Sequence, residues 1–372
     1  MRFLRVDENS PYQQLIGVGG LGTGMFFKID GDHTLGRNES RPGRLIDVKD
    51  FCKLHIIIHY VAKLLGARSS GLPFHVVPAG NVGDDRAGLY VIEQMSEVGI
   101  DASRVRVIPA LPTLFSVCFQ YPDGTGGNIT TNNSAAAAFT TNDIDGITDV
   151  LRAGGRRVIA LAAPEVPLKV RKYFLEAATR TGAFRAASFV TAEIQPARDA
   201  GMFELLDLVA LNQSEAEELV KAPFLPESPQ PFVSACQELL RSSYPYLKMV
   251  VSAGKTGAYG LTAGACNFCA AQKVEVASTA GAGDSLLGGV LAALAAGIPF
   301  SCADDPTGNR PQRSIRTALQ LGVLLASYKC QSPHTINSSA NVDALVKLAS
   351  NTGLSLSPEI ENLFVDEPDV GS

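Results

Sequence analysis

The chain has 372 residues, of which 46% are hydrophobic and 19% are charged. This length and composition suffice for one large α/β domain or two ordinary domains with a sizeable buried core. The formal net charge of −5, with no run of five like charges, gives no reason to expect a nucleic acid or a membrane surface as partner.

The sequence gives no indication of secretion or of a membrane-spanning segment. Its first residues lack the apolar stretch and small-residue cleavage site of a secretory signal. The longest uncharged apolar run, residues 286–300, is shorter than the roughly 18 residues that a membrane span requires. Seven cysteines, an odd number spread over a long chain, are typical of a reducing compartment. We therefore expect a soluble, cytoplasmic protein.

The first fifth of the chain is predicted to contain two strands, a polar excursion and a helix. The first strand is expected at residues 15–18, and a second apolar run follows at 25–29. Residues 29–47 are polar, charged and punctuated by glycine, which favours an excursion away from the core. Apolar residues then recur at helical spacing, so a helix is predicted over residues 48–65.

From residue 74 the pattern is a repeated strand and helix. The predicted pairs are strand 74–78 with helix 83–98, strand 158–162 with helix 168–181, strand 184–190 with helix 200–206, and strand 208–211 with helix 214–220, followed by the helix 233–240 and the strand 249–252. Such alternation is typical of a mostly parallel central sheet flanked on both faces by helices. The predicted fold class is therefore α/β.

Two segments depart from this rhythm. Residues 105–108 and 113–121 alternate apolar and polar side chains before a Pro-Asp-Gly turn, which predicts antiparallel strands. Together with the polar excursion, they would form a small β lid on the sheet. We place this lid at about residues 22–47 and 103–130.

The C-terminal part is predicted to be helical and to end in an acidic tail. Helices are expected at 284–296, 313–329 and 341–350, surface loops at 222–232 and 304–311, and a loosely held tail at 359–372. The predicted organisation is a single α/β domain over residues 1–335, with a C-terminal helix and acidic tail over 336–372.

Two glycine-rich segments are interpreted as structural. The segment from Gly17 to Gly22 matches the dinucleotide pattern GxGxxG, but a strand-like run follows it, where that pattern requires a helix. The sequence Gly254-Lys255-Thr256 looks like the end of a P-loop. However, Met249 stands where the P-loop needs its first glycine, so we interpret this segment as a tight turn between strands.

A third glycine-rich segment, residues 278–284, has the pattern of a reaction centre. A strand at 273–277 and an amphipathic helix at 285–296 are predicted on either side. Gly281 and Gly283 allow backbone amides to approach an anion at the helix N-terminus. A carboxylate beside a bound phosphate is repelled unless it has a task, and the base that deprotonates an attacking hydroxyl is such a task. Helix capping would explain Asp284 but not the glycines. The segment therefore predicts a phosphotransferase centre.

Several motifs, in order along the chain, resemble those of the ribokinase-like (PfkB) family of carbohydrate kinases. The resemblance covers about residues 15–335. Residues 280–285 look like the family's anion hole and catalytic aspartate, and the segment from Asn81 through Gly83 and Asp84 to Asp101 is similar to its segment after the early strands. Asn212 to Glu215 is similar to its Asn-x-x-Glu motif, which organises magnesium and its waters. Residues 252–257 are similar to the turn before its nucleotide-binding strands.

The resemblance implies a ribokinase-like fold and a Mg²⁺- and ATP-dependent kinase that phosphorylates a hydroxyl of a sugar or sugar-like small molecule. The implied catalytic residues are Asp284 as base and Gly281, Ala282 and Gly283 as anion hole. The implied cofactor-binding residues are Asn212, Glu215, Ser252, Gly254, Gly257, Thr279 and Ala280, with Glu215 holding the metal through water. The expected substrate residues are Asn81, Gly83, Asp84, Arg37 and Asn38. Self-association as a homodimer would involve the lid.

On the acceptor side the sequence departs from the family. The acidic residue that grips sugar hydroxyls aligns with Gly24, and the family's Gly-Gly pair aligns with Cys52 and Lys53. The polar excursion is either solvated surface or a site where Arg37 or Arg41 meets an acidic or phosphorylated substrate. These departures leave a second hypothesis, a catalytically inactive kinase-fold protein that binds a nucleotide or sugar as sensor or scaffold.

Two pairs of potential metal ligands are interpreted as structural. Cys266 and Cys269 have the spacing of a redox motif, but no second such pair completes a zinc site. His55 and His59 lie four residues apart on one helix face, without the acid of an HExxH arrangement between them. We expect these histidines to pack in the interior or to lie on the surface.

Overall fold

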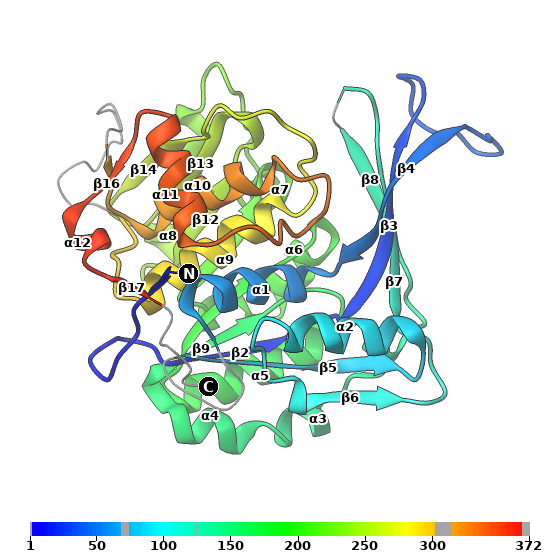
Figure 1. Ribbon diagram of the computed structural model, residues 1–372, viewed down its shortest axis with the longest axis horizontal. Helices are drawn as coiled ribbons and strands as arrows, with labels where there is room; N and C mark the ends of the chain where they lie inside the picture. The colour runs from blue at the N-terminus through cyan, green and yellow to red at the C-terminus, as the bar shows by residue number, and fades with distance from the viewer. Residues whose placement is uncertain (1, 68–73, 124, 302–313, 367–372) are drawn as a thin grey trace.

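The computed structural model describes residues 2–67, 74–123, 125–301 and 314–366. Within them, the central sheet has nine strands in the order β14-β13-β12-β11-β10-β9-β2-β5-β6 (Figure 1). Their bounds are β2 Gln14–Val18, β5 His75–Gly83, β6 Val105–Ile108, β9 Val158–Ala162, β10 Phe184–Ser188, β11 Leu208–Asn212, β12 Lys248–Ser252, β13 Gly257–Leu261 and β14 Cys266–Ala270. All neighbours from β6 to β12 are parallel, and β13 and β14 continue the sheet antiparallel.

Helices cover both faces of this sheet, as the alternating pattern predicts. One buried core contains residues of α1 (Lys53–Leu65), α2 (Arg86–Ser96), α9 (Ala282–Ala295), α10 (Ala318–Lys329) and α11 (Val342–Asn351). The other contains residues of α3 (Thr141–Asp145), α4 (Thr148–Gly154), α5 (Leu168–Thr181), α6 (Ile194–Asp199), α7 (Gln213–Val220) and α8 (Gln230–Ser243). On the first face, α9 packs between α1 and α10. The fold is an α/β architecture with a mostly parallel sheet, as predicted.

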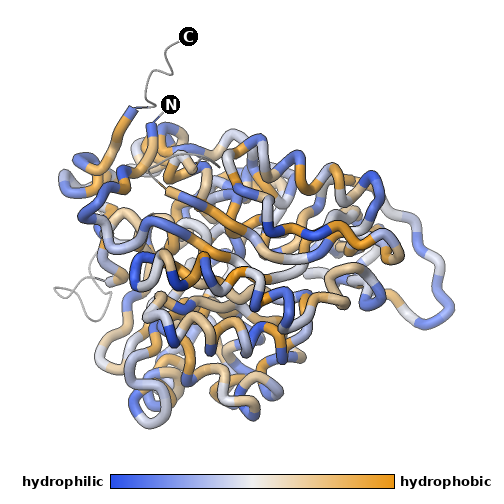
Figure 2. The backbone as a smooth tube through the Cα atoms, turned by 90° about the horizontal axis from the view of Figure 1, so that it is seen from below, coloured by the Kyte–Doolittle hydropathy of each residue, from blue (hydrophilic) through white to orange (hydrophobic). Residues whose placement is uncertain are grey.

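A second, four-stranded sheet projects from one side of the molecule and is called the lid sheet below (Figure 1). It consists of β4 (Gly43–Phe51), β3 (Gly22–Ile29), β7 (Leu114–Gln120) and β8 (Gly126–Thr130), in that spatial order. Strand β7 pairs antiparallel with β8 across the predicted Pro-Asp-Gly turn and parallel with β3. The strands predicted to be antiparallel, residues 105–108 and 113–121, do not pair with each other, because the first pairs with β5. The connection between β3 and β4 forms the hydrophilic projection seen in Figure 2.

Two predictions for this region are wrong. Residues 48–51 belong to strand β4, so the helix predicted from residue 48 begins at Lys53. The reason is pairing with β3, in which Gly24 lies opposite Asp50. The successive residues Asp47, which is buried, and Val48, which is exposed, face opposite sides, as the alternation of a strand requires. Residues 105–108 form β6 and extend the central sheet in parallel with β5 instead of joining the lid sheet.

Two elements predicted in the second half also differ. In place of the helix 200–206, α6 ends at Asp199 and only a short turn of 3₁₀ helix, Phe203–Leu205, follows. The segment 273–277 is not a strand, because it lies along helix α10 and has no neighbouring strand among the described residues to pair with. The amide of Gln272 donates to Ser327 Oγ of α10 at 3.0 Å, and the amide of Ala277 donates to the carbonyl of Cys330 at 2.8 Å.

The C-terminal segment is held more firmly than the predicted tail. Strand β17 (Phe364–Asp366) pairs antiparallel with β1 (Arg2–Leu4), and α12 (Pro358–Glu361) precedes it. A short parallel ladder joins β15 (Ser314–Ile315) to β16 (Ser355–Leu356). The prediction of a loose tail is therefore wrong for residues 359–366, while residues 367–372 and the predicted loop 304–311 lie outside the described residues. Among the helices described, none is both long and apolar enough to cross a bilayer.

Candidate active site

The glycine-rich segment forms the N-terminus of α9. Gly281 caps this helix in the left-handed conformation, with φ of 76°. A Cβ atom at this position would lie 2.7 Å from the carbonyl oxygen of Thr335, so glycine is required twice over, by conformation and by space. The helix is not amphipathic as predicted: nearly all its residues from Ser285 onward are buried, because α1 and α10 pack on either side of it.

The backbone amides of this segment divide into two groups. The amide of Ala280 donates to Ser278 Oγ at 3.2 Å, and the amide of Ala282 donates to the carbonyl of Thr279 at 3.1 Å. The amides of Gly281 and Gly283 have no acceptor in the described chain and lie at the helix N-terminus, where an anion is favoured. An anion bound at this helix N-terminus could therefore accept from the amides of Gly281 and Gly283, whereas the amide of Ala282 is already engaged.

Asp284 lies in the first turn of α9, with 12% of its side chain exposed. Its Oδ1 is 3.8 Å from Nζ of Lys53, the first residue of α1. Burial raises the pKa of Asp284 above its ordinary value, and the ammonium groups of Lys53 and Lys329 oppose that rise. Lys329 is fully buried in α10, and its Nζ donates to the carbonyl of Ser278 at 3.1 Å. The carboxylate of Asp284 thus lies near two ammonium groups, that of the partly exposed Lys53 and that of the fully buried Lys329.

The second motif lies where β11 ends and α7 begins. Asn212 caps α7: its Oδ1 accepts from the amide of Glu215 at 2.9 Å, and Glu215 Oε2 accepts from the amide of Asn212 at 2.7 Å. Burial raises the pKa of Glu215 to about 7, although its hydrogen bond from Asn212 and the charge of Lys53 act in the opposite direction. Asn212 and Glu215 therefore form a helix-capping box, which holds the Glu215 carboxylate at the edge of a cavity.

That cavity, of about 180 Å³, contains the reaction centre. Asp284, Gly281 and Gly283 line it from α9, Asn212 and Glu215 from the end of β11, and Lys53 from α1. Elements far apart in the sequence meet here because the carboxyl ends of parallel strands share one edge of the sheet.

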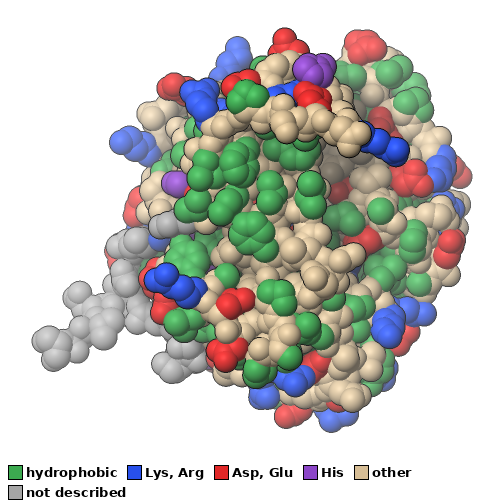
Figure 3. Space-filling view, turned by 90° about the vertical axis from the view of Figure 1, so that its right-hand side faces the viewer, with side chains coloured by type: hydrophobic (Ala, Val, Ile, Leu, Met, Phe, Trp, Pro, Cys, Tyr) green, Lys and Arg blue, Asp and Glu red, His purple; other side chains and the backbone are tan. Residues whose placement is uncertain are grey.

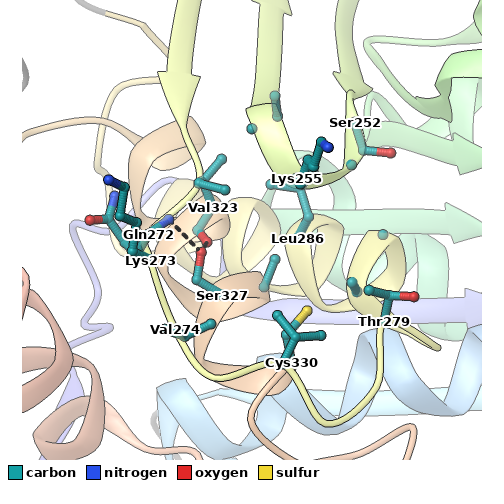
Figure 4. Close-up of a pocket in the computed structure, with 18 of the residues that line it drawn as sticks. Ser252, Lys255, Gln272, Lys273, Val274, Thr279, Leu286, Val323, Ser327 and Cys330 are labelled. Atoms are coloured by element: carbon teal, nitrogen blue, oxygen red, sulfur yellow. Dashed lines mark hydrogen bonds between the residues drawn. The ribbon is translucent and has the colours of Figure 1, made fainter. Parts of the chain in front are cut away.

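A larger cavity of about 550 Å³ adjoins it and shares Asn212, Ser252, Thr279, Ala282, Gly283 and Leu286 with it. Figure 4 shows Leu286 of α9 and Val323 of α10 on its walls, with the extended segment around Val274 along one side. Gly254 and Gly257 line its far end at the turn between β12 and β13. Gly257 has φ of 133°, and a Cβ atom there would lie 2.0 Å from the carbonyl oxygen of Cys269. The long, mostly apolar shape fits a flat heterocycle whose attached phosphates reach Gly283.

A third cavity, also of about 550 Å³, lies on the opposite side of Lys53. Its polar lining comes from β8 and the residues after it, and from the loop after β9. These polar residues are Asn128, Thr130, Thr131, Asn132, Ser134 and Glu165, and Glu193 adds a second acid from the turn before α6. Lys53 lines both this cavity and the small one, so the third cavity lies next to the cavity that contains Asp284.

Glu165 is the residue that sequence reasoning missed. Its backbone is left-handed, with φ of 75°, and burial raises the pKa of its carboxyl to about 7. Its Oε2 has no hydrogen-bond partner in the described chain. A Cβ atom on Gly20 would lie 2.4 Å from Cβ of Glu165, so glycine at 20 makes room for it. Its one signal in the sequence is its place just after a buried parallel strand.

The predicted substrate residues near β5 lie behind the third cavity. The side-chain amide of Asn81 donates to the carbonyl of Ala135 at 3.2 Å, and the amide of Gly83 donates to Thr113 Oγ1 at 2.8 Å. Asp84 is exposed. Asn81 thus braces the chain next to Ser134, which lines the cavity.

The predicted lid residues Arg37 and Asn38 lie elsewhere. They are exposed in the connection between β3 and β4 and are not among the residues that line the three cavities. Arg41 is engaged within this connection, where its Nη2 lies 2.6 Å from Glu39 Oε1 and its Nη1 donates to the carbonyl of His33. The structure does not bring these arginines to the third cavity.

At Gly24 the structure explains the departure from an acidic residue. A Cβ atom there would lie 2.4 Å from Ser116 Oγ and 3.0 Å from Asp50 Oδ2. Asp50 is buried on β4 and accepts from Ser116 Oγ at 3.1 Å and from Cys118 Sγ at 3.0 Å. The neighbouring strand therefore occupies the space that a side chain at 24 would need.

The two histidines of α1 are buried, which confirms the packing interpretation and excludes the surface one. Their ring nitrogens have no hydrogen-bond partner in the described chain. The ring of Phe51 lies 4.4 Å from that of His55. Burial lowers the pKa of both rings, that of His59 to about 3, so both are neutral. Cys266 and Cys269 lie on β14, and neither forms a disulfide within the described residues.

The model of the pfkB family of carbohydrate kinases matches residues 59–341 of this chain. The match includes Asp284, the glycines of the anion hole and the Asn212–Glu215 motif. The chain therefore belongs to the pfkB family and is a carbohydrate kinase.

Solved structures share the fold over most of the chain. A ribokinase from Cryptococcus neoformans in complex with ADP has 18% identity and a TM-score of 0.68, covering 90% of this chain and 99% of that one. A ribokinase from Arabidopsis thaliana complexed with ribose and ATP has 18% identity and a TM-score of 0.65, covering 91% and 98%. An E. coli protein described as a ribokinase II, in complex with ATP and Mg²⁺, has 16% identity and a TM-score of 0.67, covering 91% and 99%. No curated protein matches the sequence.

Proposed function

We propose that this protein transfers the γ-phosphoryl group of ATP to a hydroxyl of a neutral sugar or sugar-like molecule, with Mg²⁺. The observation that carries the proposal is the row of three neighbouring cavities, of which the small middle one is lined by the Asp284 carboxylate and by two glycines whose amides have no acceptor in the described chain. The base of the nucleotide would lie in the large apolar cavity with its phosphates reaching Gly283, and the acceptor would lie in the polar cavity beyond Lys53. The relatives solved with ADP, with ATP and Mg²⁺, and with ribose and ATP support this division.

The proposed reaction is an in-line displacement. Asp284 takes the proton of the acceptor hydroxyl, and the oxygen forms a bond to the γ-phosphorus. The bond from that phosphorus to the β,γ-bridging oxygen breaks, and its electron pair leaves with ADP. The amides of Gly281 and Gly283 stabilise the charge on the phosphoryl oxygens. The products are a phosphomonoester and ADP, and the protonated Asp284 returns its proton to solvent.

Glu215 is the residue proposed to hold the metal through water. Both oxygens of its carboxylate accept from Asn212, which fixes the group and leaves further lone pairs toward the cavity. Magnesium keeps several of its waters and often has few protein ligands, so such an outer contact fits it. The metal would supply charge neutralisation between the β- and γ-phosphates.

The lining of the acceptor cavity favours an uncharged acceptor. Its amides and hydroxyls pair well with sugar hydroxyls, and Glu165 would repel a phosphate or carboxylate when ionised. The arginines that could attract an anion lie in the connection between β3 and β4. We therefore propose a polyhydroxylated substrate without a phosphate group. The alternative, in which Arg37 binds a phosphorylated substrate, has no support from the position of Arg37.

The direct test is an assay of ADP formation from MgATP over pentoses, hexoses, nucleosides and their phosphorylated forms, comparing wild type with Asp284→Asn. We expect turnover with an unphosphorylated member that disappears in the variant. Binding of nucleotide and sugar without turnover in the wild type would instead favour the non-catalytic sensor or scaffold. Turnover limited to phosphorylated sugars would contradict the neutral acceptor.

Self-association through the lid sheet is also proposed. The face in Figure 3 shows hydrophobic side chains gathered over this sheet, and its exposed apolar residues include Leu45, Val48 and Ile129. Light scattering after gel filtration tests the proposal: we expect a dimer that Ile129→Lys dissociates, and a monomeric wild type would contradict it.

A further inference from the structure

Lys329 is a buried charged side chain that takes no part in the reaction proposed above. It is the last residue of α10, and it is fully buried. An ammonium group removed from water is unfavourable unless polar partners compensate for the lost hydration. The partners that the structure gives to Lys329 therefore indicate what this residue does.

Its hydrogen-bond partner lies in residues 278–283, called the anion-hole segment below. Nζ of Lys329 donates to the carbonyl of Ser278 at 3.1 Å. Cys330, the next residue, binds the same stretch of chain, because its carbonyl accepts from the amides of Ala277 at 2.8 Å and of Ser278 at 3.3 Å. Figure 4 shows Cys330 next to this extended stretch. The C-terminus of α10 thus fixes the backbone of Ser278 through both its amide and its carbonyl.

The fixed backbone leads directly into the anion hole. Ser278 is buried, and its Oγ accepts from the amide of Ala280 at 3.2 Å. The next residue is the left-handed Gly281, whose Cα packs against the carbonyl of Thr335. Because only two residues separate Ser278 from Gly281, a displacement of Ser278 would change the direction in which the amides of Gly281 and Gly283 point.

The charges around Lys329 come from two sides of the site. Burial lowers the pKa of Lys329 to about 8, and four neighbours oppose this change: Cys330, Asp50, Asp284 and Asp47. Two of the carboxylates belong to the lid strand β4, and the third is the proposed base. At neutral pH, Lys329 therefore places a positive charge next to the segment that must hold a phosphoryl group, among acids that would repel such a group.

We propose that Lys329 is a positioning residue for phosphoryl transfer: its buried ammonium holds the carbonyl of Ser278, and this keeps the amides of Gly281 and Gly283 directed at the transferred phosphoryl group. The inference rests on the proposed function, and it gives Lys329 no contact with either substrate. Donors that are fixed before the reaction need no reorganisation when charge develops on the phosphoryl oxygens. ADP depends less on these donors, because the large apolar cavity contacts the rest of the nucleotide.

This role differs from two simpler ones. If Lys329 only stabilised the fold, its removal would lower the free energy of unfolding and would affect the binding of all ligands alike. If it only supplied charge from a distance, the Ser278 hydroxyl, which connects the held backbone to Ala280, would not matter.

The test uses a mimic of the transferred group, so it does not depend on knowing the acceptor. Calorimetric titration measures the affinity for MgADP, alone and with aluminium fluoride, which forms a phosphoryl-like anion next to ADP. Lys329→Met keeps the length of the stem and removes the ammonium, and Ser278→Ala keeps the ammonium and removes the acceptor of the Ala280 amide. Lys347→Met, at an exposed position of α11, is the matched control. Urea unfolding of each variant measures its stability.

In the wild type and in Lys347→Met, we expect aluminium fluoride to tighten MgADP binding. In Lys329→Met, this tightening should fall by at least tenfold, while the affinity for MgADP alone should change less than about threefold, since the donors to the transition state are disturbed. Ser278→Ala should lose about threefold to tenfold of the tightening, as expected for one neutral hydrogen bond.

Tightening that is equal in Lys329→Met and wild type would overturn the inference and leave the proposed function intact. An equal loss of affinity for MgADP with and without aluminium fluoride would show a merely structural role and would refute it too. If Lys329→Met does not fold, Ser278→Ala decides, and unchanged tightening in that variant overturns the inference. A wild type that binds no MgADP would overturn both proposals.

Steady-state kinetics provide a second readout once an acceptor supports turnover. An interaction that acts in the transition state lowers kcat and kcat/KM together when it is lost. Lys329→Met should therefore lower kcat at least tenfold and leave the KM for ATP within about threefold of the wild type. A raised KM for ATP with an unchanged kcat would contradict the positioning role.

Discussion

The nucleotide side and the acceptor side of the site are built by different means. On the nucleotide side, backbone groups define the geometry, at the left-handed Gly281 and at the turn through Gly257, where any side chain would strike a carbonyl oxygen. On the acceptor side, side chains from the lid sheet and from the loop after β9 define the polar cavity. A backbone site constrains which residues can form it. A side-chain cavity can be relined while the fold stays the same.

The family match spans both sides. Residues 59–341 include the anion-hole segment, the base and the Asn212–Glu215 motif. They also include every residue that lines the polar cavity except Lys53. The comparison therefore teaches that the two sides differ in how they are built, by backbone or by side chains, and not in whether the family match includes them.

The largest expected effect concerns the point at which the two sides meet. Asp284→Asn keeps the shape but removes the base, so kcat should fall by roughly 10²–10⁴-fold. Affinity for MgADP should change little, because the anion-hole amides remain. Steady-state kinetics and calorimetry on the same preparation check this. Substantial turnover in the variant would refute the assignment of the base.

Gly281→Ala should destabilise the nucleotide side, because it strains the backbone at the N-terminus of α9. The left-handed conformation alone should cost roughly 1–2 kcal/mol in the free energy of unfolding, and the contact with the carbonyl of Thr335 adds to this. Gly283→Ala is the matched control for stability, since a Cβ atom there meets nothing within 4 Å. Urea unfolding measures both. Equal losses in the two variants would contradict the backbone argument.

Glu165→Gln should act on the acceptor side alone. A hydrogen bond to a charged group contributes about 1.5–3 kcal/mol, so losing the charge should raise the acceptor KM by roughly tenfold. The KM for ATP should be unchanged. Kinetics with each substrate varied in turn distinguish the two, and a rise in both KM values would argue against separate sides.

The effect expected to be smallest near neutral pH is the pH dependence of stability from α1, the helix that joins both sides. The folded-state pKa of His59 is about 3, below its ordinary value, so the unfolded chain binds its proton first as the pH falls. Stability should be fully present above about pH 6.5 and decline toward pH 3, by at most about 1.4 kcal/mol per pH unit for one histidine. Chemical unfolding at several pH values should show a shallower decline in His59→Gln. An unchanged slope would contradict burial of a neutral ring.

The nucleotide side was predictable from sequence because its physical requirements appear in residue identity. Gly281, Gly283 and Asp284 lie together in the chain, and Asn212 with Glu215 forms a cap whose spacing is fixed by one helical turn. The alternation of strands and helices likewise predicted the parallel sheet, since each element is long enough to show its period.

The acceptor side could not be predicted to the same extent, because its residues meet only through tertiary pairing. Glu165 is a single acid after a proline, without periodicity to mark it. The end of strand β4, residues 48–51, has the sequence pattern of a helix start, but pairing with β3 decides its conformation. The segment 273–277 has the composition of a strand but lies against α10. In each case the deciding partner is far away in the sequence.

The pairing of β1 with β17 has a consequence for the order of folding. Arg2–Leu4 cannot find its partner until Phe364–Asp366 has been synthesised, so the two ends join only after the intervening sheet exists. That sheet then holds the ends near each other and removes most of the entropy cost of closing so long a loop. The ribbon is short and peripheral, and such elements open at low free energy. Hydrogen exchange of the amides in β1 and β17 should therefore be faster than in the central strands, so the last structure to form would be the first to open.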